Sequence, residues 1–391
     1  MALPGGKTAF AFAAGTTYLD HGGFGVAPRE VLRAAFEMRE AVEAAPRPFF
    51  DQDFRPRWRD VAGRVARRFS AAAGDLALVD NVTDGVNAVL RALALRPGDE
   101  ILITSMTYGA LARAARRIAE EKGAGVIEAP IPFPTPCPEL CVEAIRATLT
   151  PRTRLAILDH VTSPTALVLP IAEMTRACRD RGVMVLADGA HAPGNVALDV
   201  PAVGADWYVG NLHKWYFAPR GCGFLWAHPD RRERLAPTVL SWDIDKPFPH
   251  SFEWTGTRDP SSWLSVPAAF DFMDRFGEAE VRKHNHDLVM EGSRLLYRAW
   301  KVEIPIPESM IAGMALVPLP AISGFSATEE GRAKVQATLW RDHSIACPCI
   351  LFGERLHVRV CAQIYNEIED YEKLAQAVSR WIWSREHHTR V

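Results

Sequence analysis

The sequence predicts an α/β protein in which a large domain holds a mainly parallel sheet and a smaller α+β domain follows it. Two observations support this prediction. Short apolar runs alternate with helix-period segments from about Leu76 to Ala227. After Trp263 the pattern changes to one long helical segment and then to shorter runs. We place the large domain at 18–263, and we assign 1–17 and 264–391 to the small domain.

The predicted sheet is built from seven short apolar runs. They are Leu76–Val79, Glu100–Thr104, Gly125–Glu128, Arg154–His160, Val183–Ala187, Trp207–Gly210 and Cys222–Ala227. The runs at 155–158 and 183–186 are continuously apolar, which is typical of strands buried on both faces. Helices are predicted between strands at Val86–Leu95, Ala110–Glu121 and Ile171–Arg181. The stretch Pro130–Pro138 predicts a loop, because proline cannot donate to a ladder or continue a helix.

The small domain is predicted from four later segments. A helix is expected from Val266 to about Trp300, and short apolar segments lie near Met314–Pro318 and His357–Cys361. A final helix begins at about Asp370.

Composition excludes several functional classes. Hydrophobic residues make up 48% and charged residues 24% of the 391 residues, which is typical of a folded protein and argues against disorder. The net charge of −2 favours neither a nucleic-acid groove nor a polybasic membrane patch. The early apolar run Ala9–Ala14 is shorter than the core of a signal peptide. Seven cysteines without a secretory signal favour a reducing compartment, so we expect a cytoplasmic protein.

A lysine follows one predicted strand in the segment Asn211-Leu212-His213-Lys214-Trp215. An unpaired ammonium is costly to bury, so a lysine at the end of a buried strand is unusual. An imine with a carbonyl cofactor would remove that charge and supply a nucleophile. The alternative is a lysine whose charged end simply reaches solvent.

Polar residues follow other predicted strands in the same way. Asp188 could pair with a protonated ring nitrogen and His191 could reach the same ring, or the aspartate could cap a helix. The segment that contains Thr83 and Asp84 could bind a phosphate at a helix N-terminus, or it could be an ordinary capped start. Tyr108 could lie flat on an aromatic ring or merely pack. In this order, the residues are the parts of a pyridoxal-phosphate (PLP) site.

With these residues in this order, the chain resembles the class V aminotransferase group of fold-type-I PLP enzymes. Within that group it is most similar to the isopenicillin N epimerase-like branch. The resemblance covers Tyr18 to the C-terminus. Its most specific stretches are Tyr18-Leu19-Asp20-His21-Gly22, Asp188-Gly189-Ala190-His191-Ala192-Pro193-Gly194, Asn211-Leu212-His213-Lys214-Trp215, Trp254-Thr255-Gly256-Thr257-Arg258-Asp259, and Arg359 with Tyr365-Asn366. Two positions depart from the pattern, since Ala166 stands where many relatives have glycine and Asp20 where we expect asparagine.

The resemblance implies a role for each matching residue. Lys214 corresponds to the Schiff-base lysine and Asp188 to the partner of the pyridine nitrogen. The other implied cofactor contacts are His191 and Thr162 to the phenolic oxygen, Thr83, Asp84, Asn211 and His213 around the phosphate, and Tyr108 on the ring. Thr257 corresponds to a residue that reaches the phosphate of a neighbouring subunit, which implies a homodimer with shared sites. Arg359 corresponds to the arginine that binds the substrate carboxylate, and His21 lies in the same substrate pocket.

The reaction stays open between several outcomes. An epimerase acting at Cα of an amino acid is the leading interpretation, and a C–S lyase acting on a cysteine derivative is the alternative. An epimerase needs a second acid, for which His21, Tyr216 and His250 are possible by type. A desulfurase would need a nucleophilic cysteine, but we expect Cys347 and Cys349 to be small buried residues. We expect no metal site, because these cysteines and His357 have no second ligand pair. An aminotransferase or a PLP-binding protein without catalysis is less favoured.

Overall fold

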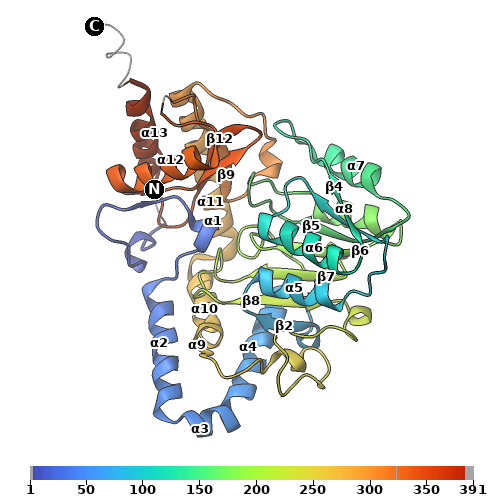
Figure 1. The fold of residues 1–391 in the computed structure, drawn as a ribbon. Helices are drawn as coiled ribbons and strands as arrows, with labels where there is room; N and C mark the ends of the chain where they lie inside the picture. The colour runs from blue at the N-terminus through green and yellow to red at the C-terminus, as the bar shows by residue number, and fades with distance from the viewer. Residues whose placement is uncertain (1–2, 323, 384–391) are drawn as a thin grey trace. The chain divides into compact units, whose positions relative to one another are not determined.

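A computed structural model describes residues 3–322 and 324–383 of the chain, which divide into two compact units (Figure 1). The sheet unit contains residues 26–163 and 169–275. The C-terminal unit contains the chain up to Gly25, residues 164–168, and the chain from Phe276 onward. The domain limits 18–263 and 264–391 with 1–17 stay a prediction.

The sheet unit holds a seven-stranded sheet in the order β2-β8-β7-β6-β5-β3-β4. The strands are β2 (Leu76–Val79), β3 (Glu100–Thr104), β4 (Gly125–Ala129), β5 (Thr153–Asp159), β6 (Met184–Gly189), β7 (Trp207–Asn211) and β8 (Gly223–Ala227). Only β8 runs against its neighbours, so the carboxyl ends of the other strands share one edge. The prediction of a mainly parallel α/β sheet is confirmed.

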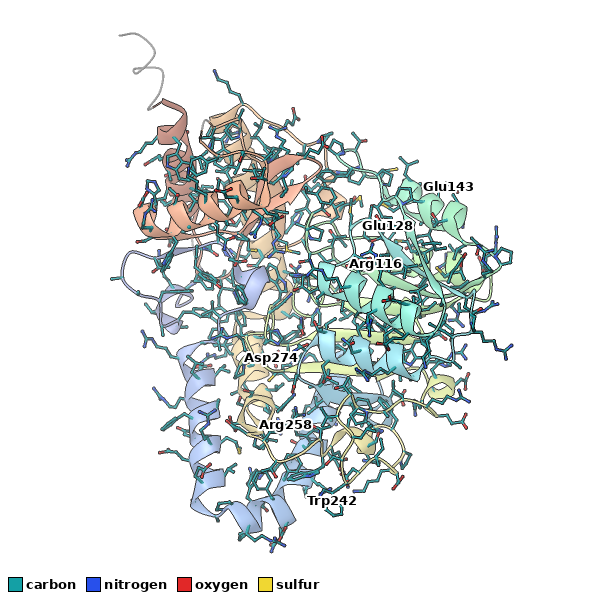
Figure 2. The ribbon with its side chains drawn as sticks, viewed as in Figure 1. Arg116, Glu128, Glu143, Trp242, Arg258 and Asp274 are labelled. Carbon is teal, nitrogen blue, oxygen red and sulfur yellow. The ribbon has the colours of Figure 1, made fainter. Side chains whose placement is uncertain are left out.

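Burial explains why these segments form this sheet. Every residue of β2, β3, β7 and β8 is buried. The runs at 155–158 and 183–186, predicted to be buried on both faces, lie in the central strands β5 and β6. The edge strand β4 is partly exposed and carries Glu128, which forms an ion pair of 3.2 Å with Arg116 of the adjacent helix (Figure 2). A charged edge discourages pairing with a further strand.

Helices connect the strands and cover the sheet. They are α2 (Arg29–Ala44), α3 (Pro46–Pro48), α4 (Phe54–Arg68), α5 (Val82–Ala92), α6 (Gly109–Glu121), α7 (Pro138–Thr148), α8 (Ile171–Arg179), α9 (Ser261–Leu264) and α10 (Val266–Phe276). Helix α5 packs against α6, and α7 packs against α8. Because parallel crossovers are right-handed, these two pairs lie on opposite faces of the sheet (Figure 1). The proline-rich loop is confirmed up to residue 137, and Pro138 is the first residue of α7.

The C-terminal unit has its own core. It contains the antiparallel sheet β11 (Cys349–Phe352), β12 (Arg355–Cys361) and β9 (Met314–Pro318), and the parallel pair β1 (Thr17–Tyr18) and β10 (Ile345–Ala346). Its helices are α1 (His21–Phe24), α11 (Glu278–Trp300), α12 (Glu329–His343) and α13 (Ile368–Trp383). Val289, Val335, Val358 and Leu374 are fully buried and join α11, α12, β12 and α13 in one hydrophobic cluster.

The prediction of one helix from Val266 to Trp300 is wrong. Gly277 has a φ of +79°, a left-handed conformation that ends α10 at Phe276, and α11 then starts at Glu278. The hydrophobic pattern continues across this glycine, so the pattern alone did not reveal the break.

No helix in the described part of the chain is both long enough and apolar enough to cross a membrane.

Candidate active site

Polar residues gather after the carboxyl ends of the parallel strands of the sheet unit. Tyr108 follows β3, Thr162 follows β5, and Lys214 follows β7, while Asp188 lies within the last two residues of β6. These strands end at one edge of the sheet, which is where open α/β sheets bind their ligands. The sequence-predicted residues of this unit therefore share an edge.

Lys214 and His191 form the reactive pair of this edge. Lys214 is half-buried, and its Nζ lies 3.1 Å from Nε2 of His191. On the other side of the ring, Nδ1 of His191 accepts the indole N–H of Trp215 at 3.4 Å. A neutral histidine that accepts at Nδ1 carries its proton on Nε2. The Nε2–H group then donates to Lys214, which pairs correctly when the lysine is an uncharged amine.

Asp188 is a buried carboxylate, 4% exposed, beside this pair. Its Oδ1 accepts the backbone N–H of Ala190 at 2.8 Å. Burial raises the pKa of Asp188, while the Ala190 N–H and the charge of Lys214 act in the opposite direction. A protonated ring nitrogen would compensate this buried charge, so the residue suits the pyridine nitrogen of PLP.

The start of α5 supplies donors for a phosphate. The Asn81 side chain caps the backbone N–H of Asp84 at 3.0 Å, and Oδ1 of Asn211 accepts the N–H of Val82 at 3.0 Å. The exposed Thr83 lies between these two capped positions, so its hydroxyl remains at the positive end of an 11-residue helix. The Asp84 carboxylate accepts the Thr238 hydroxyl at 2.7 Å. Asn211 therefore shapes the cradle through its amide oxygen.

His213 is a conditional phosphate donor. Its Nδ1 lies 2.9 Å from the backbone oxygen of Cys222, which can only accept, so Nδ1 carries the proton. Burial lowers the pKa of His213 to about 4, so the ring is neutral near pH 7 and Nε2 is an acceptor. His213 can donate to a phosphate only after the phosphate charge has drawn a proton onto Nε2.

Tyr108 and Thr257 have exposed side chains. Tyr108 is 46% exposed at the N-cap of α6, so its ring can cover a ligand. Thr162 is fully buried. Thr257 is exposed, and the adjacent Arg258 binds Asp80 at 2.8 Å, after β2 (Figure 2). The contact of Thr257 with a neighbouring subunit stays a prediction.

The predicted substrate-binding residues lie in the C-terminal unit. Arg359 on β12 is 5% exposed, and its Nη2 forms an ion pair of 3.4 Å with Oδ1 of Asp20. His21 follows directly, and its Nδ1 lies 2.9 Å from the hydroxyl of Tyr365. A Cβ at Gly23 would meet the Asp20 carboxylate at 2.3 Å, so the aspartate needs this glycine. These contacts bring the implied carboxylate arginine and His21 into one cluster.

Two other candidates for a second acid have structural contacts. The Tyr216 ring is fully buried and packs edge-on against Phe69 and Phe270. His250 lies 2.6 Å from the buried carboxylate of Glu253, which also binds Arg59. These contacts explain both side chains without a role at the sheet edge.

The cysteines that a desulfurase would need are buried. Cys347 is 2% and Cys349 1% exposed, and both belong to the hydrophobic cluster of the C-terminal unit. Burial raises the pKa of Cys349 to about 12 and that of Cys347 well above its ordinary value. Nδ1 of His357 contacts the backbone oxygen of Arg355, and no cluster able to hold a metal occurs among the described residues. The expectation that the cysteines are small buried residues is confirmed.

Sequence reasoning missed Asp159. It is the last residue of β5, is 1% exposed, and lies in register with Asp188 on β6. The available signal was an aspartate at the end of a continuously apolar run, the same pattern that identified Asp188. The left-handed φ of +61° at Ala166 likewise explains why glycine is expected at that position.

Residues 17–322 match the aminotransferase class-V family. The chain belongs to this family. A putative L-cysteine desulfhydrase 1 from Oryza sativa subsp. japonica is 31% identical over 94% of this chain and 84% of that protein. An isopenicillin N epimerase from Amycolatopsis lactamdurans is also 31% identical, over 93% of this chain and 94% of that protein.

Solved structures share the fold. The cystine C–S lyase C-DES in complex with cysteine persulfide has a TM-score of 0.79 and is 24% identical, covering 94% of this chain and 98% of that one. A C-DES variant with glycine covalently linked to the PLP cofactor has a TM-score of 0.82 and is 23% identical, covering 96% and 99%. The fold-type-I prediction is confirmed.

Membership in this family makes the chain a PLP-dependent enzyme. The residues present fit this cofactor. A buried carboxylate suits the ring nitrogen, a helix N-terminus with a free hydroxyl suits the phosphate, and an amine beside a neutral imidazole suits the carbonyl carbon. The individual residue roles stay predictions.

Proposed function

We propose that this chain is a C–S lyase that eliminates the sulfur substituent from Cβ of L-cysteine or a close cysteine derivative. The sheet-edge site supports this choice over the epimerase that the sequence favoured. The similarity to L-cysteine desulfhydrases agrees with this choice. The chain is equally identical to an isopenicillin N epimerase, so sequence identity alone does not favour either reaction.

The observation that carries the proposal is the contact between Lys214 and His191, an acid–base pair at the sheet edge. Lys214 and His191 are in contact, whereas Tyr216 and His250 are engaged in structural contacts. Epimerisation requires a second acid that delivers a proton to the opposite face of Cα. Elimination requires one group that removes the Cα proton and can return a proton to the departing sulfur.

The residues of the chain account for each proton. PLP, when bound, withdraws electron density from the substrate Cα and so weakens its C–H bond. Neutral Lys214 takes the Cα proton at Nζ, with its amine oriented by His191. The electron pair of that C–H bond forms the Cα–Cβ double bond, the Cβ–S bond breaks, and the sulfur leaves as a thiolate. The ammonium of Lys214 then returns the proton to sulfur, which restores the amine.

The products follow from the balance of this step. L-Cysteine yields hydrogen sulfide and 2-aminoacrylate, which takes up water to give pyruvate and ammonia. Arg359 binds the substrate carboxylate in this proposal, because a planar guanidinium matches two carboxylate oxygens. Asp20 fixes the orientation of that guanidinium through the ion pair of 3.4 Å.

An epimerase is the second candidate, and one observation favours it. His21 and Tyr365 form a buried imidazole–phenol pair next to Asp20, the partner of Arg359. Burial raises the pKa of Tyr365 well above its ordinary value, so the phenol keeps its proton and is able to donate it. Such a pair would suit a second acid.

Incubation of the PLP-loaded protein with L-amino acids in D₂O separates the two reactions. L-Cysteine should give pyruvate and sulfide in equal amounts, without accumulation of D-cysteine. His21→Gln should change this rate by less than about 10-fold, because elimination needs no second acid. Deuterium at Cα with inverted configuration and no pyruvate would instead establish the epimerase.

We also propose that the enzyme is a cytoplasmic homodimer whose sites are shared. The exposed Thr257 supports this proposal, because its hydroxyl remains available to a second copy of the chain. The mixing experiment described in the Discussion tests the sharing.

A further inference from the structure

Asp159 is a second buried carboxylate beside the predicted cofactor residue Asp188. The two aspartates pair in register on the parallel strands β5 and β6, and both are buried, at 1% and 4% exposure. Side chains at paired positions of neighbouring strands extend from the same face of the sheet. Two adjacent ionised carboxylates in such surroundings would repel each other strongly. The proposed mechanism assigns no role to Asp159.

The partners of Asp159 come from the turn after β3. Its Oδ2 accepts the hydroxyls of Thr107 at 3.2 Å and Thr104 at 3.4 Å. The backbone N–H of Tyr108 also donates to this carboxyl group. The turn is closed internally, because the N–H of Thr104 donates to Oγ1 of Thr107 at 2.9 Å. Asp159 therefore binds both ends of the segment 104–108.

That turn ends at the residue predicted to cover the cofactor ring. Tyr108 is 46% exposed, so few of its own side-chain contacts limit its orientation. The backbone N–H of Tyr108 donates to Asp159, and the chain then continues directly into α6. The position of the ring is thus set mainly by the turn, and the turn is attached to β5 through one carboxyl group.

We propose that Asp159 is a positioning residue for the cofactor, which fixes the turn that carries Tyr108 against the strand ends that carry Asp188. This inference rests on the cofactor roles predicted for Tyr108 and Asp188 and does not depend on which reaction the enzyme catalyses.

The surroundings of the carboxylate pair favour the proton on Asp159. Asp188 is favoured as the ionised member by the N–H of Ala190 and by the charge of Lys214. Burial and the charge of Asp188 raise the pKa of Asp159 well above its ordinary value, against the effect of its three donors. Two further titratable groups lie close to the pair, Tyr208 and its hydrogen-bond partner His160. Burial raises the pKa of Tyr208 and lowers that of His160 to about 4, so both stay neutral near pH 7. Asp159 is therefore the member of the pair that favours the protonated form.

This protonation state makes asparagine a close substitute for Asp159. An asparagine Oδ1 can accept from Thr104 and Thr107 as the carboxyl oxygen does, and its amide can replace the acid O–H. Alanine, in contrast, removes the acceptor that binds the turn to the end of β5. Comparing Asp159→Asn with Asp159→Ala therefore shows whether Asp159 acts by holding the turn or by carrying a charge.

The experiment measures PLP binding to the apoprotein by visible absorbance and visible circular dichroism. Asp159→Ala should raise the Kd for PLP about 10-fold and reduce the dichroism of the bound cofactor, because three hydrogen bonds to the turn are lost. Asp159→Asn should stay within about 3-fold of the wild-type Kd. Asp206→Ala is the matched control. Asp206 accepts the N–H of Val185 at 2.8 Å at the start of β7, so its loss should lower Tm without changing the Kd.

A double-mutant cycle shows whether Asp159 acts through Tyr108. If it does, Tyr108→Ala with Asp159→Ala should raise the Kd no more than the larger single change, since coupled residues are not additive. Should Asp159→Ala fail to fold, Thr107→Val removes one donor and should change the Kd in the same direction. Three results would overturn the proposal. One is a wild-type Kd for PLP in the folded Asp159→Ala variant, and another is additive effects of Asp159→Ala and Tyr108→Ala on the Kd. The third is an Asp159→Asn variant that binds PLP as weakly as Asp159→Ala.

Discussion

Replacing Cys347 and Cys349 together by alanine should leave turnover almost unchanged while lowering stability. A desulfurase attacks the substrate sulfur with a cysteine thiolate, so the ionised fraction decides whether either residue can serve. The pKa of Cys349 is about 12, and at pH 7.5 the difference of about 4.5 units leaves a thiolate fraction of about 3 × 10⁻⁵. Burial raises the pKa of Cys347 as well, to well above its ordinary value.

The stability cost follows from the packing of the same two thiols. Both sulfur atoms lie in the hydrophobic cluster of the C-terminal unit, and removing them leaves small cavities. The expected loss is about 1–3 kcal/mol for the pair, which is smaller than the about 5–15 kcal/mol that stabilises an ordinary domain. The variant should therefore fold with a lower Tm.

The assay compares pyruvate release from L-cysteine with Tm and with the visible absorbance of bound PLP. We expect kcat/KM within about 3-fold of wild type, because neither thiol participates in the chemistry. A loss of more than about 10-fold, with folding and cofactor absorbance intact, would refute the reasoning and restore the desulfurase interpretation.

Three further predictions concern the cofactor site. Mixing Lys214→Ala chains with Thr257→Ala chains should restore part of the activity after subunit exchange, because each hybrid dimer has one undamaged site. No recovery despite verified exchange would place Thr257 within the site of its own subunit. PLP binding should weaken as pH rises from about 4 to the higher pKa that His213 has beside the bound phosphate, because His213 has a pKa of about 4 in the apoprotein and must take up a proton to bind the phosphate. This part of the pH dependence should disappear in His213→Gln, and an unchanged profile would contradict it. Finally, burial raises the folded pKa of Asp159 above its ordinary 3.8, so the folded state retains a proton that the unfolded state releases, and apoprotein stability falls as pH rises from about 4. The apoprotein of Asp159→Asn should lose less Tm between pH 5 and pH 8 than wild type, and equal losses would show that Asp159 does not hold this proton.

The sheet and most of the cofactor residues could be predicted because local sequence determines both. Strands buried on both faces are mainly apolar, so β2, β3 and β7 appear as short apolar runs. A charged residue directly after such a run is costly to bury and therefore points to function, as at Lys214 and Asp188.

Other features depend on contacts that a local pattern does not contain. The break at Gly277 follows from a backbone conformation that interrupts a continuing hydrophobic pattern. Asp159 gains its meaning from the turn after β3, more than 50 residues earlier in the chain. The neutral state of His213 depends on its burial in the folded sheet unit. Each of these required the folded neighbours to be known.

The most direct test of the account is to reduce the PLP-loaded enzyme with borohydride and map the modified peptide. We expect PLP to become fixed to Nζ of Lys214. Lys214→Ala should carry no fixed cofactor and produce no pyruvate from L-cysteine. Cofactor fixed to another lysine in the wild-type enzyme, or normal pyruvate production by Lys214→Ala, would contradict this expectation.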